Sequence, residues 1–520
     1  MFFGTNLGTL SSQLIYEKEF SFSKFDVVIN SILMVIAFVV LLVTMNKYKK
    51  FVTLALTTGI FAVIGMTAVN MNTIYTSISP LKEQAVNIAA SMPEFTLSKA
   101  KNNVIVLMMD RAMGPYIPYL VNEKPELMQK FDGFTYYENT VSHGGYTNFG
   151  APALFGEYEY TPSEMNARDT ESLASKHNEA LKVMPVLFDQ NGYNVTVCDV
   201  PYGNYQWITD LSIYDEYPNI NKYKTIGRFN STANGDAVFV NNCRNFFCYS
   251  LTKSAPLAVQ PLIYDNGRYY GQELEGEYVS QSVEGSSVAN GIDKTFMDSY
   301  NVLKSLDKMT QIDNDSNGAF VMMNNETTHA LSLLQEPEYE PKESVNNTEY
   351  DENNVNRFDL NDKKMDMSSD QDYEHYEMNM ASLIQLGNWF DYLRANGVYD
   401  NTKIIIVSDH GRNLGQFDEL KMNTGNDNYD LEYYTPLLMV KDFNSTGFKT
   451  SDEFMTNGDV PTIATSGAIE NAINPFTGKQ INADDKTAHD QYVIVSEECD
   501  VSTNNGTQFI PADWLSVHGR

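Results

Sequence analysis

The longest apolar runs of this chain come first, and shorter runs follow at intervals. Val27–Met45 and Phe51–Val69 contain no charged residue, and each is close to the roughly 20 helical residues that cross a bilayer core. A cleaved signal sequence fits less well, because the first run is long, starts late and is followed by a second. Two buried helices of a soluble protein are the other alternative. We predict two transmembrane helices within residues 25–70.

The connector between these runs sets the expected orientation. Asn46–Lys50 contains three lysines, and short basic loops remain on the cytoplasmic side of membranes. The isolated charges of Lys18, Lys24 and Lys82 compete with this signal only weakly. Residues 1–24 and everything after residue 70 are therefore expected outside the cytoplasm. The prediction is a multi-pass protein of the cell membrane whose large C-terminal part is extracytoplasmic.

Beyond a predicted stem at residues 71–100, short apolar runs alternate with amphipathic segments. The runs typical of buried strands are Asn103–Met109, Asn194–Cys198, Gly318–Met323, Lys403–Val407 and Pro436–Val440. Helix candidates between them include Glu179–Asn191 and Tyr376–Asn396, the second with Leu383, Leu386, Phe390 and Leu393 on one face. This alternation predicts an α/β domain with a mostly parallel central sheet covered by helices on both faces.

The predicted catalytic domain covers residues 101–480, and a C-terminal segment follows at 481–520. Within it, Glu336–Glu374 is acidic, rich in asparagine and poor in apolar residues. Such a composition favours a solvated insertion rather than a functional site.

Composition and charge narrow the function classes. The chain is 42% hydrophobic and 12% aromatic residues, which suits a packed core. A net charge of -31, from 67 acidic and 36 basic residues, repels polyanions and argues against a nucleic-acid partner. A small anionic substrate remains possible, because a bound metal can invert the local field. The four cysteines form no CxxC pair, which argues against a zinc–thiolate site.

Polar residues with metal-binding chemistry follow three of the predicted strands. Asp110 comes directly after Asn103–Met109, and Asp409 and His410 follow Lys403–Val407 after one serine. His329 comes six residues after Met323. Any one of them could be an ordinary strand-end residue, but parallel strands bring their carboxyl ends to one edge of a sheet. The set suits one divalent metal, Mn²⁺ or Zn²⁺, with Ca²⁺ or Mg²⁺ as second choices.

A candidate nucleophile lies in Ser142–Gly156, which reads SHGGYTNFGAPALFG. Thr147 follows two glycines and precedes a predicted short helix. Amide groups at a helix N-terminus favour an anionic oxygen, so a reactive hydroxyl there is chemically reasonable. The alternative is that Thr147 is a plain helix N-cap.

Four segments in this order carry a resemblance to a known family: NVIVLMMD, YTNFGAPALFG, THALSLLQEP and KIIIVSDHG. Together they resemble the alkaline phosphatase/sulfatase superfamily over about residues 101–465. The most similar branch contains lipoteichoic acid synthases and phosphoethanolamine transferases. Matched residue by residue, the resemblance implies metal ligands Asp110, Thr147, Asp409 and His410, catalysis by Thr147 and His329, and substrate contacts from His329 and Trp207.

Three departures from family patterns affect the expected substrate. Sulfatases proper use a formylglycine, made from Cys or Ser inside Cys-x-Pro-x-Arg, where this chain has Thr147. They also place two adjacent acids after the first strand, whereas Asp110 is followed by Arg111. Synthases that hold glycerol phosphate have an arginine shortly after the tryptophan, and this chain has residues 208–210 as Ile, Thr and Asp. The first two departures argue against sulfate esters, and the third argues against phosphoglycerol.

The resemblance implies a membrane-anchored, metal-dependent transferase with a phospho-threonine intermediate. It would move a phosphoglycerol- or phosphoethanolamine-type headgroup from a membrane lipid to an envelope glycan or lipid acceptor. One alternative is a hydrolase of the same fold, acting as phosphodiesterase, phosphatase or sulfatase. A second alternative is an inactive extracellular binding module on a membrane anchor.

Overall fold

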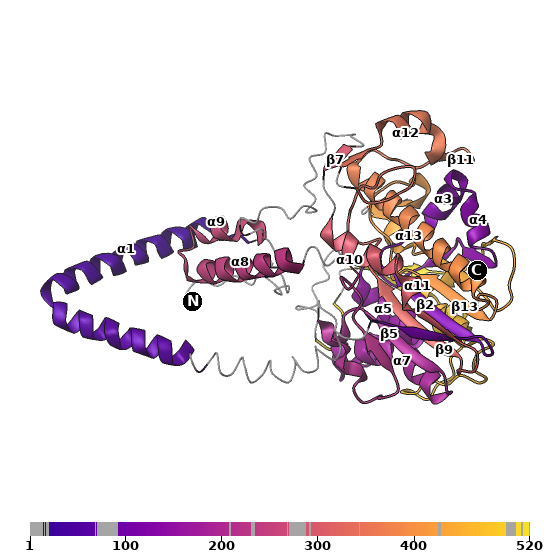
Figure 1. The fold of residues 1–520 in the computed structure, drawn as a ribbon, viewed down its shortest axis with the longest axis horizontal. Helices are drawn as coiled ribbons and strands as arrows, with labels where there is room; N and C mark the ends of the chain where they lie inside the picture. Colours follow the sequence, from indigo (N-terminus) through magenta and orange to yellow (C-terminus); the bar gives the residue numbers. More distant parts are fainter. Residues whose placement is uncertain are drawn as a thin grey trace. The chain divides into compact units, whose positions relative to one another are not determined.

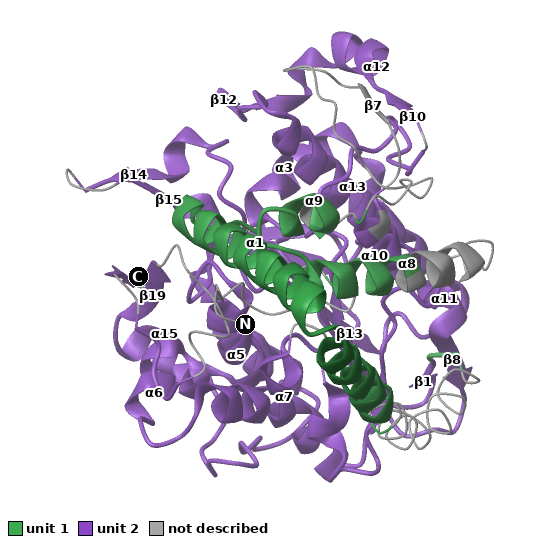
Figure 2. Ribbon diagram, turned by 90° about the vertical axis from the view of Figure 1, so that its left-hand side faces the viewer, with its two compact units in different colours: residues 1–93, 233–272 green, residues 94–232, 273–520 purple. Residues whose placement is uncertain are grey.

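The structure is a computed structural model, and the chain divides into two compact units (Figures 1 and 2). Unit 1 comprises residues 1–93 and 233–272, and unit 2 comprises residues 94–232 and 273–520. The residues that the structure describes are 14, 16, 20–67, 69, 92–206, 210–229, 235–267, 269, 288–290, 293–342, 344–424, 428–495, 506–510 and 513–518.

Unit 1 contains the two predicted membrane helices. They are α1 (Lys24–Lys47) and a second helix, Lys49–Thr67. Both are long and apolar enough to cross a membrane, and 0% and 6% of their most apolar stretches are buried. This exposure argues against core helices of a soluble protein, because such helices bury one face. Two further helices, α8 (Gly235–Ser254) and α9 (Gln260–Tyr264), belong to the same unit.

Unit 2 is built on an eight-stranded sheet. Its order is β17 (Lys449–Ser451), β3 (Phe134–Tyr137), β16 (Leu438–Lys441), β13 (Thr402–Val407), β2 (Asn103–Met109), β9 (Ala319–Asn325), β5 (Asn194–Cys198) and β6 (Asn221–Tyr223). Within this sheet β16 is antiparallel to both of its neighbours, and the other adjacent pairs are parallel. The predicted α/β class with a mostly parallel central sheet is confirmed.

Helices cover both faces of this sheet, which explains why its central strands read as continuous apolar runs. In β2, Val104 and Val106 face one core, whereas Ile105 and Leu107 face the other. The first core contains residues of α5 (Thr147–Gly156), α7 (Leu173–Gln190) and α14 (Val460–Thr465). The second contains residues of α3 (Ile117–Glu123), α4 (Glu126–Lys130), α10 (Lys294–Leu303), α11 (Leu306–Met309) and α13 (Asp370–Ala395). The four apolar residues predicted on one face of α13 are all buried there.

Smaller elements complete unit 2. Short strands pair as β1 (Phe95–Ser98) with β8 (Thr310–Asp313), β4 (Thr140–Val141) with β18 (Met455–Thr456), β7 (Val288–Asn290) with β10 (Ser344–Asn346), β11 (Asp359–Leu360) with β12 (Lys363–Lys364), β14 (Lys421–Asn423) with β15 (Asn428–Asp430), and β19 (Gln491–Val495) with β20 (Asp513–Val517). The remaining α-helices are α6 (Pro162–Ala167), α12 (Thr348–Asn353) and α15 (Asp484–Ala488). Residues 95–98, predicted as stem, thus form a strand of unit 2, and stem residues 71–91 lie outside the described residues.

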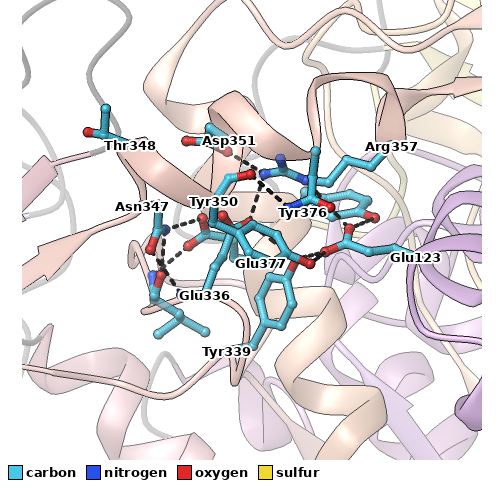
Figure 3. Close-up of polar contacts among 12 residues, drawn as sticks. Glu123, Glu336, Tyr339, Asn347, Thr348, Tyr350, Asp351, Arg357, Tyr376 and Glu377 are labelled. Atoms are coloured by element: carbon cyan, nitrogen blue, oxygen red, sulfur yellow. Dashed lines mark hydrogen bonds and ion pairs between the residues drawn. The ribbon is translucent and has the colours of Figure 1, made fainter.

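The acidic insertion differs from its prediction as a solvated segment. Phe358 and Met365 are buried in the core under α13, and the side chain of Glu336 is fully buried. Figure 3 shows the polar cluster that joins this insertion to the domain. A composition poor in apolar residues can still pack where its polar groups satisfy one another.

Glu123, the last residue of α3, is the centre of this cluster. Its carboxylate accepts hydrogen bonds from the hydroxyls of Tyr339, Tyr350 and Tyr376. Guanidinium nitrogens of Arg357 lie 2.8 Å from a carboxyl oxygen of Glu336, 2.5 Å from one of Asp351 and 3.6 Å from one of Glu123. The insertion is therefore held to α3 and α13 by a buried network, which composition alone does not reveal.

Candidate active site

Two neighbouring strands bring the predicted metal ligands together. β13 and β2 are parallel, with Val407 opposite Met108, so the residues that follow them emerge at the same edge of the sheet. The ligand atoms of Asp110, Asp409 and His410 all lie within 4.8 Å of one another, and all three residues are buried. The geometry thus joins Asp110 to a pair of residues that follows it by about 300 positions in the sequence.

The imidazole of His410 is oriented to bind a cation. Its Nδ1 lies 2.7 Å from the carbonyl oxygen of Gly411, and only a protonated Nδ1 can donate to that oxygen. The lone pair is then on Nε2, which lies 3.5 Å from Oδ2 of Asp409. Burial lowers the pKa of His410, which favours the neutral ring that metals require.

The two carboxylates leave buried oxygens for a cation. Oδ1 of Asp110 and Oδ2 of Asp409 have no hydrogen-bond partner among the described residues. Burial, and next the charge of Asp409, raises the pKa of Asp110 well above its usual value. Nε of Arg111 lies 4.0 Å from Oδ1 of Asp110, but one guanidinium cannot balance two buried carboxylates that face one another. The donor set of two carboxylates and one imidazole therefore fits a divalent metal ion.

Thr147 lies at this site but not as a helix cap. It is the first residue of α5, and the N-cap is Tyr146, which makes no side-chain capping bond. The Thr147 side chain is instead hydrogen-bonded to the carboxylate of Asp110. Its hydroxyl thus lies beside a predicted metal ligand and at the N-terminus of a ten-residue buried helix, where the peptide dipoles favour negative charge.

Close packing holds α5 against the loop that carries Asp409. A Cβ atom on Gly150 would lie 2.1 Å from the carbonyl oxygen of Asp409, so only glycine allows this approach. The Nδ2 amide of Asn457 donates to the same oxygen at 2.9 Å and to the carbonyl of Gly150 at 3.3 Å. These contacts fix the distance between the helix of the candidate nucleophile and the candidate metal ligands.

His329 belongs to the same region, whereas Trp207 lies outside the described residues. Burial and the charges of Arg111, His410 and Arg412 lower the pKa of His329 well below its usual value. Nη1 of Arg412 donates to the backbone carbonyl of His329 at 3.3 Å. The imidazole is therefore neutral and can both donate and accept a hydrogen bond.

Sequence reasoning missed three further residues of this site. Arg111 and Arg412 both act on the pKa values of His410 and His329, which places two guanidinium groups beside the predicted ligands. Arg111 has a left-handed φ of 63°, which is uncommon outside glycine. Burial raises the pKa of Glu326, after β9, to about 7, with further contributions from Asp199 and Asp409. The position of both arginines directly beside Asp110 and the DHG segment was the available signal.

Comparison with known proteins assigns the chain to a family. The family profile described as Sulfatase matches residues 102–464, which is more than half of the chain. No curated protein sequence matches the chain.

Several solved structures resemble the chain at low sequence identity. The phosphonate monoester hydrolase of Agrobacterium radiobacter is 13% identical, over 78% of this chain and 82% of that one, with a TM-score of 0.40. The lipoteichoic acid synthase LtaP from Listeria monocytogenes is 13% identical, over 79% and 83%, with a TM-score of 0.33. The C-terminal periplasmic domain of EcEptC from Escherichia coli, in complex with Zn, is 11% identical, over 78% and 93%, with a TM-score of 0.37.

Proposed function

Because this chain belongs to the sulfatase family, we propose that it is a membrane-anchored, metal-dependent transferase of lipid phospho-headgroups. The donor is a phosphoglycerol- or phosphoethanolamine-type lipid, and the acceptor is an envelope glycan or lipid outside the cytoplasm. The observation that carries the proposal is the hydroxyl of Thr147, hydrogen-bonded to Asp110 beside the buried Asp409 and His410. A threonine in this position favours phosphoryl transfer over sulfate ester hydrolysis.

The charges around the site suit a phosphodiester. The chain as a whole is strongly acidic, at a net -31, yet Arg111 and Arg412 converge on the site. Guanidinium groups bind phosphate oxygens through paired N–H donors. We assign to these arginines the non-bridging oxygens of the lipid phosphate.

In the first step the Thr147 oxygen attacks phosphorus. An O–P bond forms at Thr147, and the bond from phosphorus to the diacylglycerol oxygen breaks. The proton lost by the hydroxyl balances the one taken up by the leaving oxygen. His329, as a neutral imidazole with one donor and one acceptor nitrogen, is the group suited to deliver it.

The second step reverses the roles. A hydroxyl of the acceptor attacks the phospho-threonine ester, and the Thr147 oxygen leaves as a hydroxyl. Asp110, Asp409 and His410 would hold the metal ion, which supplies positive charge that lowers the pKa of the attacking hydroxyl and stabilises developing negative charge. Water in place of the acceptor would give a hydrolase with the same first step.

The anchor fits this substrate. Two helices long and apolar enough to span a bilayer precede the domain, and the basic loop Lys47–Lys50 favours a catalytic domain on the extracytoplasmic side. A tethered domain meets lipid headgroups at raised effective concentration. Lipid donor and membrane anchor are therefore two consistent parts of one proposal.

A trapped intermediate tests the proposal. The full chain in vesicles is offered phosphatidylglycerol and phosphatidylethanolamine with labelled headgroups, side by side. We expect mass spectrometry to place the added phospho-headgroup on Thr147. Thr147→Ala should lower turnover at least about 1,000-fold without loss of folded structure.

The sulfate alternative predicts a different outcome. Formylglycine releases sulfate through the second hydroxyl of its hydrated aldehyde, and threonine has no such hydroxyl. Aryl sulfates should therefore not turn over, whereas phosphodiesters should. Aryl sulfate turnover at a comparable rate would contradict the proposal, and release of free headgroup without any acceptor product would indicate a hydrolase.

A further inference from the structure

Residues 233–272 interrupt the catalytic domain in sequence, yet they group with the two apolar helices. The chain leaves unit 2 at Thr232, forms α8 and α9 in unit 1, and re-enters unit 2 at Glu273. Figure 1 shows α8 and α9 beside the first turns of α1. Neither the metal centre nor the proposed chemistry uses this segment, so its grouping with the membrane helices requires its own explanation.

Specific contacts join the segment to the start of α1. The backbone N–H of Leu257 donates to Oδ1 of Asn30, within α1, at 3.1 Å. Phe20, which precedes α1, stacks on Tyr264 with ring centroids 4.3 Å apart. Phe20, Tyr264 and Tyr269 form a small buried core of their own. The hairpin of α8 and α9 is therefore packed on the N-terminal end of the first apolar helix.

These contacts show at which height along α1 the hairpin is attached. At about 1.5 Å per residue, the helix is about 36 Å long and Asn30 lies about 9 Å from its first residue. A bilayer core is about 30 Å thick, so Asn30 lies near one boundary of the membrane if α1 spans it. The basic loop Lys47–Lys50 is at the opposite end. The hairpin thus lies at the end of α1 that the positive-inside rule assigns to the extracytoplasmic side.

The exposed side of the hairpin carries large apolar side chains together with Ser250, Lys253 and Ser254. On α8 the side chains of Phe246 and Phe247 are 65% and 63% exposed, while Thr252 on another face is buried. On α9 the side chain of Leu262 is 63% exposed. Large exposed apolar side chains next to a transmembrane helix are typical of segments that lie in the membrane interface.

The charge of the segment differs from that of the rest of the protein. Residues 233–272 contain three basic and two acidic residues, a net charge of +1 in a chain of net -31. Anionic lipids repel an acidic domain but tolerate this segment. Lys253 lies over the ring of Tyr249, 5.9 Å from its centroid, an arrangement typical of the aromatic and basic residues of membrane interfaces.

We propose that α8 and α9 form an interfacial hairpin, with Phe246, Phe247 and Leu262 inserted among the lipids of the outer leaflet beside α1. The occupant of this apolar face is the lipid bilayer. The proposal rests on the membrane anchoring of the proposed function and adds to it. Since the hairpin is continuous with the catalytic domain at both ends, it gives that domain two covalent tethers to the membrane besides the one from the second helix.

Lipid quenching tests this placement on the full chain. Phe247→Trp is reconstituted in vesicles of phosphatidylglycerol and phosphatidylcholine that carry nitroxide-labelled acyl chains, and the fluorescence of the wild type with its three tryptophans is subtracted. Nitroxides near the ester end of the acyl chain should remove roughly half of the added fluorescence, as expected for interfacial depth. Nitroxides near the methyl end should remove less.

Two matched variants separate this inference from the anchoring itself. Val35→Trp reports on α1, where the side chain is 63% exposed, and Val355→Trp reports on an exposed position of unit 2. Quenching at 35 and 247 but not at 355 supports the hairpin.

If nitroxides quench the tryptophan at position 35 but not the one at 247, the interfacial hairpin is wrong and the membrane anchor stands. If they do not quench the tryptophan at position 35, both the anchor and the hairpin are wrong. Aqueous iodide then distinguishes the failures at 247. Quenching of the tryptophan at 247 by iodide indicates that this face is solvated. Protection from both iodide and nitroxides indicates that another part of the protein covers it. Either result overturns the proposal.

Discussion

At His410 one hydrogen bond decides what the ring can bind. The carbonyl oxygen of Gly411 accepts a hydrogen bond from Nδ1–H at 2.7 Å, so the lone pair of Nε2 is free to bind a cation. Ser408 holds the same turn by donating to the carbonyl of His410 at 2.6 Å. Asp409 is fixed in parallel by the backbone N–H of Arg111 at 3.4 Å. The residues around the ligands thus orient them before any metal binds.

His410→Ala is expected to remove a metal ligand. Loss of an outer-sphere partner typically costs 10–100-fold in metal affinity, so loss of a direct ligand should cost more than about 100-fold. Metal content of the purified chain, and the rise in melting temperature on adding Mn²⁺ or Zn²⁺, would both fall. His329→Ala is the control, expected to keep the metal and slow the reaction. Full metal retention in His410→Ala would show that the ligand assignment is wrong.

At the scale of elements, the site depends on how closely α5 approaches the end of β13. Gly150 permits contact with the backbone of Asp409, and Asn457 bridges both carbonyls. Polar groups position another segment in a similar way: the cluster around Glu123 and Arg357 holds the insertion against the domain (Figure 3). Helix position in this domain is therefore set by a few close contacts as well as by the apolar core.

Gly150→Ala should disturb the site without touching a catalytic group. Its Cβ would meet the carbonyl oxygen of Asp409 at 2.1 Å, and backbone cannot rotate away, so α5 must shift. We expect a loss of about 1–3 kcal/mol in unfolding free energy together with a fall in kcat. Gly387→Ala is the matched control, because its Cβ meets the flexible Lys130 side chain, with Cδ at 2.8 Å. Equal activity and stability of the two variants would contradict this account.

The buried insertion cluster should make stability depend on pH. Burial raises the pKa of Glu336 to about 8, against a lowering effect of Arg357. Above about pH 4.3 the folded state holds a proton that the unfolded state has lost. Stability from this group therefore falls as pH rises from about 4.3 to about 8 and changes little above that. When the pH is raised from about 5.5 to about 8.5, the melting temperature should fall more for the wild type than for Glu336→Gln.

A matched control isolates the buried carboxyl. Glu349→Gln changes an exposed residue of the neighbouring α12, and its melting curve should follow the wild type. If Glu336→Gln shows the same pH slope as the wild type, Glu336 does not titrate as proposed.

At the scale of the whole molecule, connectivity matters more than any single contact. The chain passes through unit 1 twice, first as the two apolar helices and again as residues 233–272. Unit 2 is therefore attached at three points of the chain rather than one. Each added tether restricts the domain further and raises its effective concentration at the membrane surface.

The expected topology can be tested on intact cells. Protease added from outside, after removal of any cell wall, should cut unit 2, because the basic loop Lys47–Lys50 favours an extracytoplasmic domain. Lysed cells provide the control for accessible cleavage sites. Full protection of unit 2 in cells of verified integrity would show that the orientation is reversed.

The sequence by itself determined the α/β class, because strands buried on both faces need continuous apolar runs whatever surrounds them. β2 and β5 agree in bounds with their predictions, and the ends of β9 and β13 differ by two residues or fewer. The ends of these strands also predicted that Asp110, Asp409 and His410 lie together, because parallel strands bring their carboxyl ends to one edge. The apolar helices were likewise readable from length and composition alone.

Tertiary structure alone decided which polar residues surround the site and where two segments belong. Arg111 and Arg412 adjoin predicted ligands in the sequence, but only packing brings their charges close to His329. Buried contacts between Glu336 and Arg357 hold parts of the insertion in place, and the backbone of Leu257, between α8 and α9, contacts Asn30 of α1. Local patterns record burial by the apolar core, whereas these contacts join residues far apart in the chain, and no local periodicity encodes them.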